Sequence, residues 1–208
     1  QRLVDHALGV QDGQEPGFEL RRGDVHAVPQ QRLEVAPEAL LQVLQRLAGE
    51  IAAACRQQPD LKLVVGHGSG SFGHVTASKY HTRQGVRDRQ AWLGFAEVWR
   101  AANALNRLVV DSLAQAGLPV INFPHSAKIT ARDGSPAAWD LEPLKSAIQA
   151  GLLPVIHGDV VFDQQRGGTI LSTEELFNHL ALALHPSRIL LAGLESGVWA
   201  DYPLCQAL

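Results

Sequence analysis

The chain has 208 residues, of which 46% are apolar and 19% are charged, and its formal net charge is -3. This composition predicts one domain with a full core, or one domain with a small lobe, and excludes extended disorder. The weakly negative charge argues against a nucleic-acid binder, which would carry a basic face, but it allows local cationic sites for small anions.

Cysteine use and hydropathy bear on where the protein works. Cys55 and Cys205 are too few for a disulfide framework, so a reducing cytoplasm is the expected compartment. We find no run of about 18 apolar residues and no signal peptide, so neither a membrane span nor export is predicted. The chain has no methionine and begins with Gln1, and we therefore expect a fragment of a longer protein.

The first half of the chain contains two predicted helices around one strand. Residues 1–35 are polar and lack a sustained period, which predicts a weakly structured segment with a short strand at 18–20. From Pro37, leucines at a spacing of three or four predict a helix. The apolar run 61–65 predicts a buried strand, and residues 91–117 predict a long amphipathic helix that ends at a glycine.

The second half alternates short strands with helices. This alternation predicts βαβ units and a mostly parallel sheet covered on both faces, an α/β fold with antiparallel additions. In chain order we expect a strand at 119–123, a strand running into a turn at Asp133–Gly134, a helix near 141–150, a strand at 153–158, a hairpin over 160–171, a helix opened by Ser172 and a last strand at 188–193.

The stretch KLVVGHGSGSFGH, from Lys62 to His74, predicts an anion site. It follows a buried strand and so falls at the carboxyl edge of the sheet, where α/β proteins bind ligands. Successive backbone N–H groups can surround a phosphate, and a protonated imidazole adds a donor. The alternative for His74 is a solvent-facing loop residue. Lys79 and Arg83 either add positive potential to this site or are solvated side chains. The candidate phosphate-binding residues are Gly68, Ser69, Gly70, Ser71, Gly73 and His74.

Three rival readings of this glycine pattern meet obstacles. Gly68, Gly70 and Gly73 spell the dinucleotide fingerprint GxGxxG, but that motif needs an apolar helix, a second strand and an acid about 20 residues further on. The segment that follows is instead polar and basic. A Walker loop would require GK[ST], and a nucleophile elbow around Ser71 would require glycine where Ser69 stands.

Two further patterns bring polar groups to the same edge. In PVIHGDVVFD, Gly158 allows close approach of the backbone, while Asp159 either caps a turn or orients ligand groups. Ser172 and Glu175 have the spacing of a capping box, which predicts a helix N-terminus and with it a place for an anion. Glu174 has no part in that box and could organise nearby cations.

These three patterns, in this order, resemble the amino acid kinase superfamily and, within it, the isopentenyl phosphate kinase family. HGSGSFGH is similar to that family's HG(G/A)GSFGH, and PVIHGDVVFD with GGTILS resembles its HGDVVFD…ILS segment. RILLAGLESGVWADYP resembles the strand and loop where the family usually has a TDVDGVY-like stretch. The resemblance covers residues 61–203 and implies an amino-acid-kinase-like domain over 36–208, incomplete at its C-terminal end, with a three-layer αβα sandwich.

The resemblance implies phosphorylation of isopentenyl phosphate to isopentenyl diphosphate with ATP and Mg²⁺. The partner would be a small alkyl monophosphate, with no nucleic acid or membrane involved, and a homodimer is one expected assembly because relatives are commonly dimers. His74 would hydrogen-bond the substrate phosphate, in a site lined by Gly68, Ser69 and Gly158, and Glu174 would be catalytic. Gly193 and Gly197 would bind the nucleotide.

The chain departs from the family pattern mainly on the ATP side. The family's KLGGS-like start contributes a lysine to the donor phosphates, and its best counterpart here is ELRRGDVH. We therefore expect a preserved acceptor half and an altered donor half. The alternatives are an inactive phosphate-binding homologue or a kinase of another small phosphate or phosphonate acceptor. The departures are Glu19 at the lysine position, Arg21–Arg22 at the paired glycines, Glu174 and Glu175 where Asp is usual, Leu194 and Ser196 at the acidic pair, and no later nucleotide segment after Pro203.

Overall fold

The computed structural model describes residues 37–192, and Pro37–Leu184 fall within one compact unit, which is described here by itself. The strand expected at 18–20 lies outside the described residues. In chain order the elements are α1 (Pro37–Gln57), β1 (Val65–His67), α2 (Gly70–Tyr80), the 3-10 turn η1 (Thr82–Gln84), α3 (Arg89–Gln115), β2 (Val120–Asn122), β3 (Ile129–Arg132), β4 (Ser135–Trp139), α4 (Glu142–Gln149), β5 (Leu153–His157), β6 (Asp159–Asp163), β7 (Gly167–Leu171) and α5 (Thr173–Leu184).

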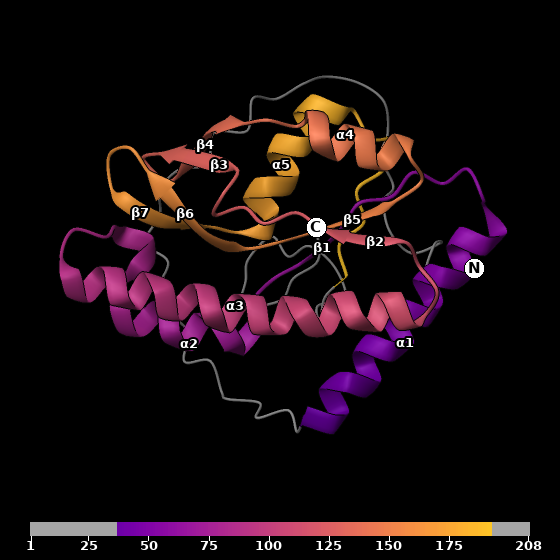
Figure 1. Ribbon diagram of the computed structural model, residues 1–208, viewed down its shortest axis with the longest axis horizontal. Coiled ribbons are helices and arrows are strands. Elements are labelled where there is room, and N and C mark those ends of the chain that lie inside the picture. The colour runs from indigo at the N-terminus through magenta and orange to yellow at the C-terminus, as the bar shows by residue number, and fades with distance from the viewer. Residues whose placement is uncertain (1–36, 193–208) are drawn as a thin grey trace, which may run out of the picture. The chain divides into compact units, whose positions relative to one another are not determined.

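The strands form two sheets (Figure 1). The first has the order β1-β5-β2 and is entirely parallel, with His67 opposite His157 in the register. The second has the order β4-β3-β6-β7, in which β3 and β6 are parallel and the outer pairs are antiparallel hairpins. The expected α/β fold is confirmed, and the two hairpins are the antiparallel additions that the turn signals predicted.

Helices cover the parallel sheet on both faces, which confirms the αβα arrangement. On one face, α1 and α3 enclose an apolar cluster that includes Leu105, Val109 and Val155. On the other face, α4 and α5 enclose a second cluster around Ile156 and Leu176. Figure 1 shows α3 running beneath both sheets, and its first half packs on the second sheet in a third cluster. One long helix therefore ties the two sheets together.

Two predictions in the first half of the chain need correction. The run 61–65 was expected to be a strand, but β1 covers only Val65–His67, which pair with Val155 to His157 of β5. The stretch GSFGH was treated as loop, but it forms the first turns of α2. Glycine disfavours helix in isolation, so this helix depends on tertiary packing against α3, where a Cβ on Gly94 would collide with Tyr80.

The strand expected at 188–193 is also wrong where it can be checked. Residues 188–192 are not in a strand, and Gly193 lies outside the described residues. An apolar run forms a strand only where a neighbouring strand takes up its backbone hydrogen bonds, so apolar composition alone does not establish one. Among residues 37–192, no helix has the length and hydropathy needed to cross a bilayer.

Candidate functional site

The glycines of the first two motifs leave adjacent strand ends. Because His67 and His157 are partners in the register, Gly68 and Gly158 follow side by side at the carboxyl edge of the sheet. The Gly158 N–H donates to Thr173 Oγ1 at 2.8 Å, and the Thr173 hydroxyl donates to His67 O at 2.6 Å. The N-terminus of α5 is therefore bonded to both strand ends.

The N-terminus of α2 opens at the same edge. Its N-cap, Ser69, makes no side-chain capping hydrogen bond, so the first-turn N–H groups keep their donor capacity. A Cβ on Gly68 or Gly70 would meet nothing within 4 Å, and Gly70 has a φ of +50°. Free donors facing open space at the positive end of a helix suit an anion.

His74 lies one turn into α2, and its side chain is exposed. Exposure leaves the imidazole free to approach a ligand bound at the start of the helix. Gly73 is buried, and a Cβ there would collide with the Ser69 side chain. The backbone of Ser71 belongs to α2, while its side chain lies outside the description.

Asp159 does not face open space. It is buried in β6, where Oδ1 accepts the Val160 N–H at 2.8 Å and Oδ2 accepts Asn103 Nδ2 at 3.1 Å. Of the two alternatives for Asp159, capping a turn is wrong, since the residue lies within a strand and bonds toward α3, while a role in orienting ligand groups stays a prediction. Its carboxylate holds the start of β6 against that helix.

Three histidines, which the sequence patterns left without a role, form a row beneath this edge. The His67 and His157 rings stack with centroids 5.3 Å apart, and His125 lies 5.7 Å from His157. Burial lowers the pKa of His67, and burial followed by the nearness of His157 lowers the pKa of His125 to about 3. Within residues 37–192 both His157 nitrogens and His125 Nε2 are buried without a hydrogen-bond partner. The sequence signal for two of these histidines was the His-Gly dipeptide that ends each strand, His67-Gly68 and His157-Gly158.

The capping box at α5 is confirmed. The Glu175 N–H donates to Ser172 Oγ at 3.2 Å, and the Ser172 N–H donates to Glu175 Oε2 at 2.6 Å. Glu175 also pairs with Arg83 at 2.7 Å, so that guanidinium is already engaged. Glu174 is exposed in the first turn, as expected of a residue outside the box.

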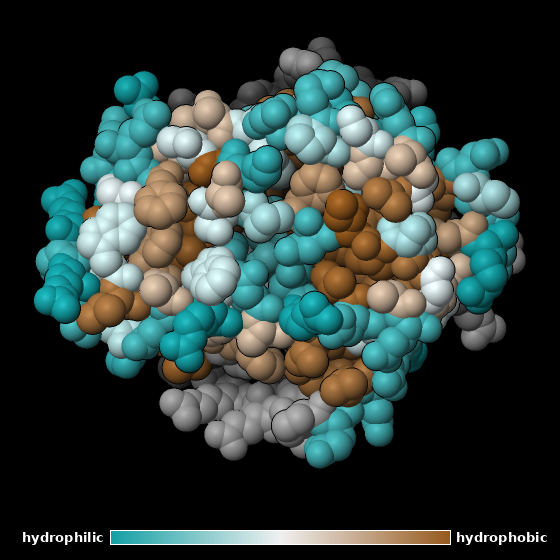
Figure 2. Space-filling view, in the orientation of Figure 1, coloured by the Kyte–Doolittle hydropathy of each residue, from teal (hydrophilic) through white to brown (hydrophobic). Residues whose placement is uncertain are grey.

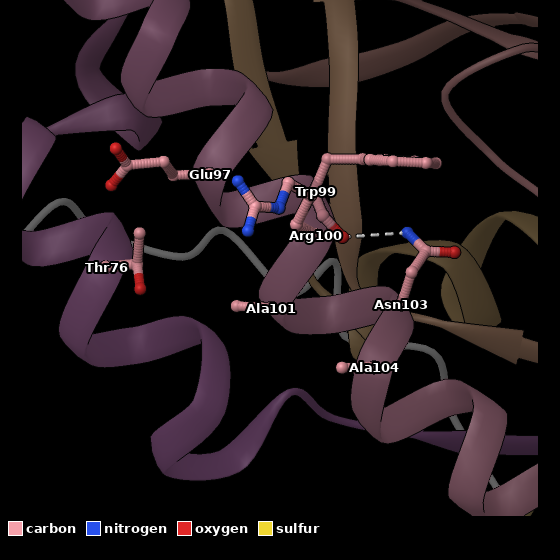
Figure 3. Close-up of a pocket in the computed structure, with 7 residues that line it drawn as sticks. All are labelled: Thr76, Glu97, Trp99, Arg100, Ala101, Asn103 and Ala104. Carbon is pink, nitrogen blue, oxygen red and sulfur yellow. Dashed lines mark hydrogen bonds between the residues drawn. The ribbon is translucent and has the colours of Figure 1, made fainter.

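A hollow lies between α2 and α3 rather than over the glycines. Its volume is about 640 Å³. Figure 3 shows Arg100 and Glu97 pointing toward it, and Asn103 on the side of Trp99. Asn103 links this hollow to Asp159. The lining residues are Thr76, Glu97, Trp99, Arg100, Ala101, Asn103 and Ala104, none of which the sequence patterns predicted.

Of the two alternatives for Lys79, the structure favours the solvated side chain, which is exposed and lies beside Glu97. Its ammonium lies 3.8 Å from Glu97 and 4.5 Å from the centroid of the Tyr80 ring. Among residues 37–192, no group of three His, Cys, Asp or Glu side chains could hold a metal ion. Glu19, Arg21–Arg22, Gly193, Leu194, Ser196 and Gly197, which concern the nucleotide side, lie outside the described residues.

Comparison with known proteins gives one consistent result. The isopentenyl phosphate kinase of Methanothermobacter thermautotrophicus is 34% identical over 166 residues, which cover 77% of this chain and 61% of that protein. The isopentenyl phosphate kinase of Methanocaldococcus jannaschii is 32% identical, with 76% and 62% covered. The chain thus spans about three fifths of the length of these curated relatives.

Solved structures agree with the sequences. An isopentenyl phosphate kinase structure superimposes with a TM-score of 0.72 at 32% identity, covering 79% of this chain and 68% of that one. The Thermoplasma acidophilum isopentenyl phosphate kinase product complex gives a TM-score of 0.69 at 25% identity. A model of the amino acid kinase family matches residues 29–206, which is most of the chain. The chain therefore belongs to the amino acid kinase family.

Proposed function

We propose that this chain belongs to an ATP-dependent kinase that converts isopentenyl phosphate to isopentenyl diphosphate, and that the described residues form its acceptor site. One observation carries the proposal: the uncapped N-terminus of α2 opens beside Gly158 at the carboxyl edge of the sheet, with His74 one turn away. The relatives with this name supply the substrate and the reaction.

The chemistry needs little from the acceptor side beyond placement. Phosphoryl transfer asks a protein mainly to align two anions and to offset their repulsion. Backbone N–H groups and a helix dipole can hold a monophosphate in one orientation, and the His74 imidazole can donate a further hydrogen bond. We assign the acceptor phosphate to Gly68, Ser69, Gly70, Ser71, Gly73, His74 and Gly158. Asp159 would support the site indirectly, by holding the start of β6 against α3.

The donor side of the proposal rests on fewer residues. MgATP would supply the transferred phosphoryl group, and Mg²⁺ often needs only one or two carboxylates besides substrate phosphates. Glu174, exposed at the first turn of α5, is the carboxylate that we assign to this task. Gly193 and Gly197 are assigned to the nucleotide from the motif alone.

Turnover tests the proposal directly. The chain is mixed with MgATP and isopentenyl phosphate, and ³¹P NMR follows the appearance of the diphosphate. We expect product with the natural residue at position 74 and a loss of at least about tenfold in kcat/KM with His74→Ala. His81→Asn is the matched control, because His81 is exposed at the end of the same helix and Asn tolerates its φ of 51°.

Calorimetry separates this proposal from its rivals. Heat with isopentenyl phosphate but none with MgATP would identify an inactive phosphate-binding homologue. Turnover of a phosphonate but not of isopentenyl phosphate would identify a kinase of another acceptor. No binding of either phosphate would contradict the assignment of the site itself.

A homodimer and a cytoplasmic location complete the proposal. The support for a dimer is an apolar hollow of about 450 Å³ where β2, an edge strand among the described residues, meets α4. Figure 2 shows an apolar area there, and Ile121 and Leu152 are each 37% exposed. Sedimentation of the wild type and of Ile121→Lys tests it, since a charge in the interface should yield monomers. The cytoplasmic location rests on the cysteine count alone.

A further inference from the structure

His67 faces two carbonyl oxygens, which fixes how its proton must be placed. Nδ1 lies 3.0 Å from Gly68 O, and Nε2 lies 3.1 Å from Asn106 Oδ1. Burial lowers the pKa of His67, so the ring is neutral at pH 7 and has one N–H and one lone pair. The two ring nitrogens therefore cannot both act as hydrogen-bond donors.

One placement of the proton gives both His67 ring nitrogens a hydrogen bond. Gly68 O can only accept, whereas the Asn106 amide can present either its oxygen or its NH₂ group at the same place. The proton therefore resides on Nδ1 and bonds to Gly68 O, while the Asn106 NH₂ donates to Nε2. Asn106 is only 4% exposed, and a buried amide is costly unless it is hydrogen-bonded. The contact with His67 therefore also supplies a hydrogen bond to the Asn106 side chain.

Pinning the Gly68 carbonyl has a consequence for the next residue. In a planar trans peptide the C=O and the following N–H point in opposite directions. With its carbonyl held toward the His67 ring, the peptide that joins Gly68 to Ser69 must direct the Ser69 N–H away from that ring. Gly68 itself is exposed, and a Cβ on it would meet nothing within 4 Å, so a ligand has room to approach this peptide.

We propose that His67 and Asn106 are positioning residues that aim the Ser69 N–H at the acceptor phosphate. This inference rests on the proposed function for the identity of the anion. The His67 ring cannot turn freely, since it stacks on His157 with an angle of 6° between the planes. On the same helix, three residues earlier, Asn103 holds Asp159 at the start of β6. Helix α3 thus supports both strand ends from which the glycines emerge.

A matched pair of variants at position 67 tests the role of Nδ1. In His67→Asn the amide nitrogen takes a place near Nδ1 and can still donate to Gly68 O, while His67→Leu fills similar volume without a donor. Both lose the ring that stacks on His157. We expect KM for isopentenyl phosphate to rise about tenfold in the Leu variant and less than about threefold in the Asn variant, with KM for ATP unchanged in both. Equal losses in the two variants, or none in the Leu variant, would overturn the inference.

A spectroscopic measurement on the wild type keeps the inference testable even if a variant fails to fold. Long-range ¹H–¹⁵N spectra distinguish the two neutral tautomers of histidine, and we expect the proton of His67 on Nδ1. In Asn106→Asp, a carboxylate replaces the donor, and we expect the Nε2 resonance to change to that of a protonated nitrogen. A wild-type proton on Nε2 would overturn the inference.

The same samples separate this inference from the proposed function. Isopentenyl phosphate is titrated into wild-type protein, and the Ser69 amide resonance is followed. Absence of any binding would count against the proposed function, while the His67 tautomer would still decide the link between His67 and Gly68. Binding that leaves the Ser69 amide unmoved would overturn the positioning role alone.

Discussion

At the scale of single residues, the buried imidazole of His125 links folding to pH. His125 and His157 are 1% and 0% exposed, and both lie in the row beneath the glycines. A buried imidazole resists protonation, because charge is costly away from water. Folding therefore competes with protonation of His125, whose pKa is lowered by burial.

Acid should destabilise the protein through His125. Its pKa falls from 6.5 to about 3 on folding, so between these values the unfolded chain binds a proton that the folded chain does not. Stability is thus present above pH 6.5 and is lost as the pH falls toward 3. Acidification from pH 6.5 to 5 should cost about 2 kcal/mol in the free energy of unfolding from this group.

Urea unfolding of the wild type and of His125→Asn at pH 6.5 and 5 measures the effect. The Asn amide can still donate to Phe123 O, as His125 Nδ1 does at 2.8 Å, but it does not titrate. The variant should lose less stability than the wild type on acidification. Equal losses would show that His125 is not the group responsible.

At the scale of elements, one carboxylate joins the two hairpins of the second sheet. Asp163, at the end of β6, accepts N–H groups of Gln165 and Arg166 from its own turn. It also accepts the N–H groups of Asp133 and Gly134, in the turn between β3 and β4. Burial alone would raise the pKa of Asp163, but these four donors outweigh it and lower the pKa.

Asp163→Asn should therefore destabilise the protein by at least about 2 kcal/mol, because an NH₂ group would face donors that need an acceptor. The control is Asp133→Asn, which loses only the partly exposed ion pair with Arg166 and should cost less than about 1 kcal/mol. Asn also tolerates the φ of 49° at position 133. Urea unfolding at pH 7 compares the two, and similar losses would contradict the role given to Asp163.

The packing of α2 on α3 depends on glycine. A methyl group at Gly94 of α3 would collide with the Tyr80 ring of α2, so Gly94→Ala should cost about 1–3 kcal/mol. The matched control is Gly49→Ala in α1, where a Cβ meets nothing within 4 Å. That change should stabilise the protein by about 0.5–1 kcal/mol through helix propensity. Thermal unfolding should shift in opposite directions, and a shared direction would contradict the packing argument.

At the scale of the whole molecule, binding at the edge of the sheet should stabilise the entire unit. The site is built from the ends of β1 and β5 and the starts of α2 and α5, which meet only in the folded chain. A ligand that binds only the folded state raises the free energy of unfolding by mass action. Isopentenyl phosphate at a hundred times its Kd should add about 2.7 kcal/mol.

Urea unfolding with and without ligand measures this linkage. Isopentenol, which has the same hydrocarbon group but no phosphate, is the matched control and should leave the midpoint unchanged. Stabilisation by both compounds would move the main contact from the phosphate to the hydrocarbon group. Stabilisation by neither would leave the glycine edge without the ligand assigned to it.

Much of the fold followed from local signals. Leucine spacing predicted α1, an apolar stripe predicted α3, and the Asp133–Gly134 turn and the Ser172 and Glu175 pair predicted a hairpin and a capped helix. Each of these signals is read within a few residues, which is why the chain alone was sufficient. The glycine motifs likewise marked the edge where the candidate phosphate site lies.

The sequence by itself marked the residues that we propose to bind phosphate, and it predicted most of the regular elements. Only the tertiary structure decided that GSFGH begins a helix, since that depends on how closely α2 packs on α3. It also decided that His67 stacks on His157 and meets Asn106, because strand register and helix placement bring together residues that are distant in the chain. A local pattern reports the preferences of a few residues, whereas the aim of a single peptide N–H depends on contacts made across the fold.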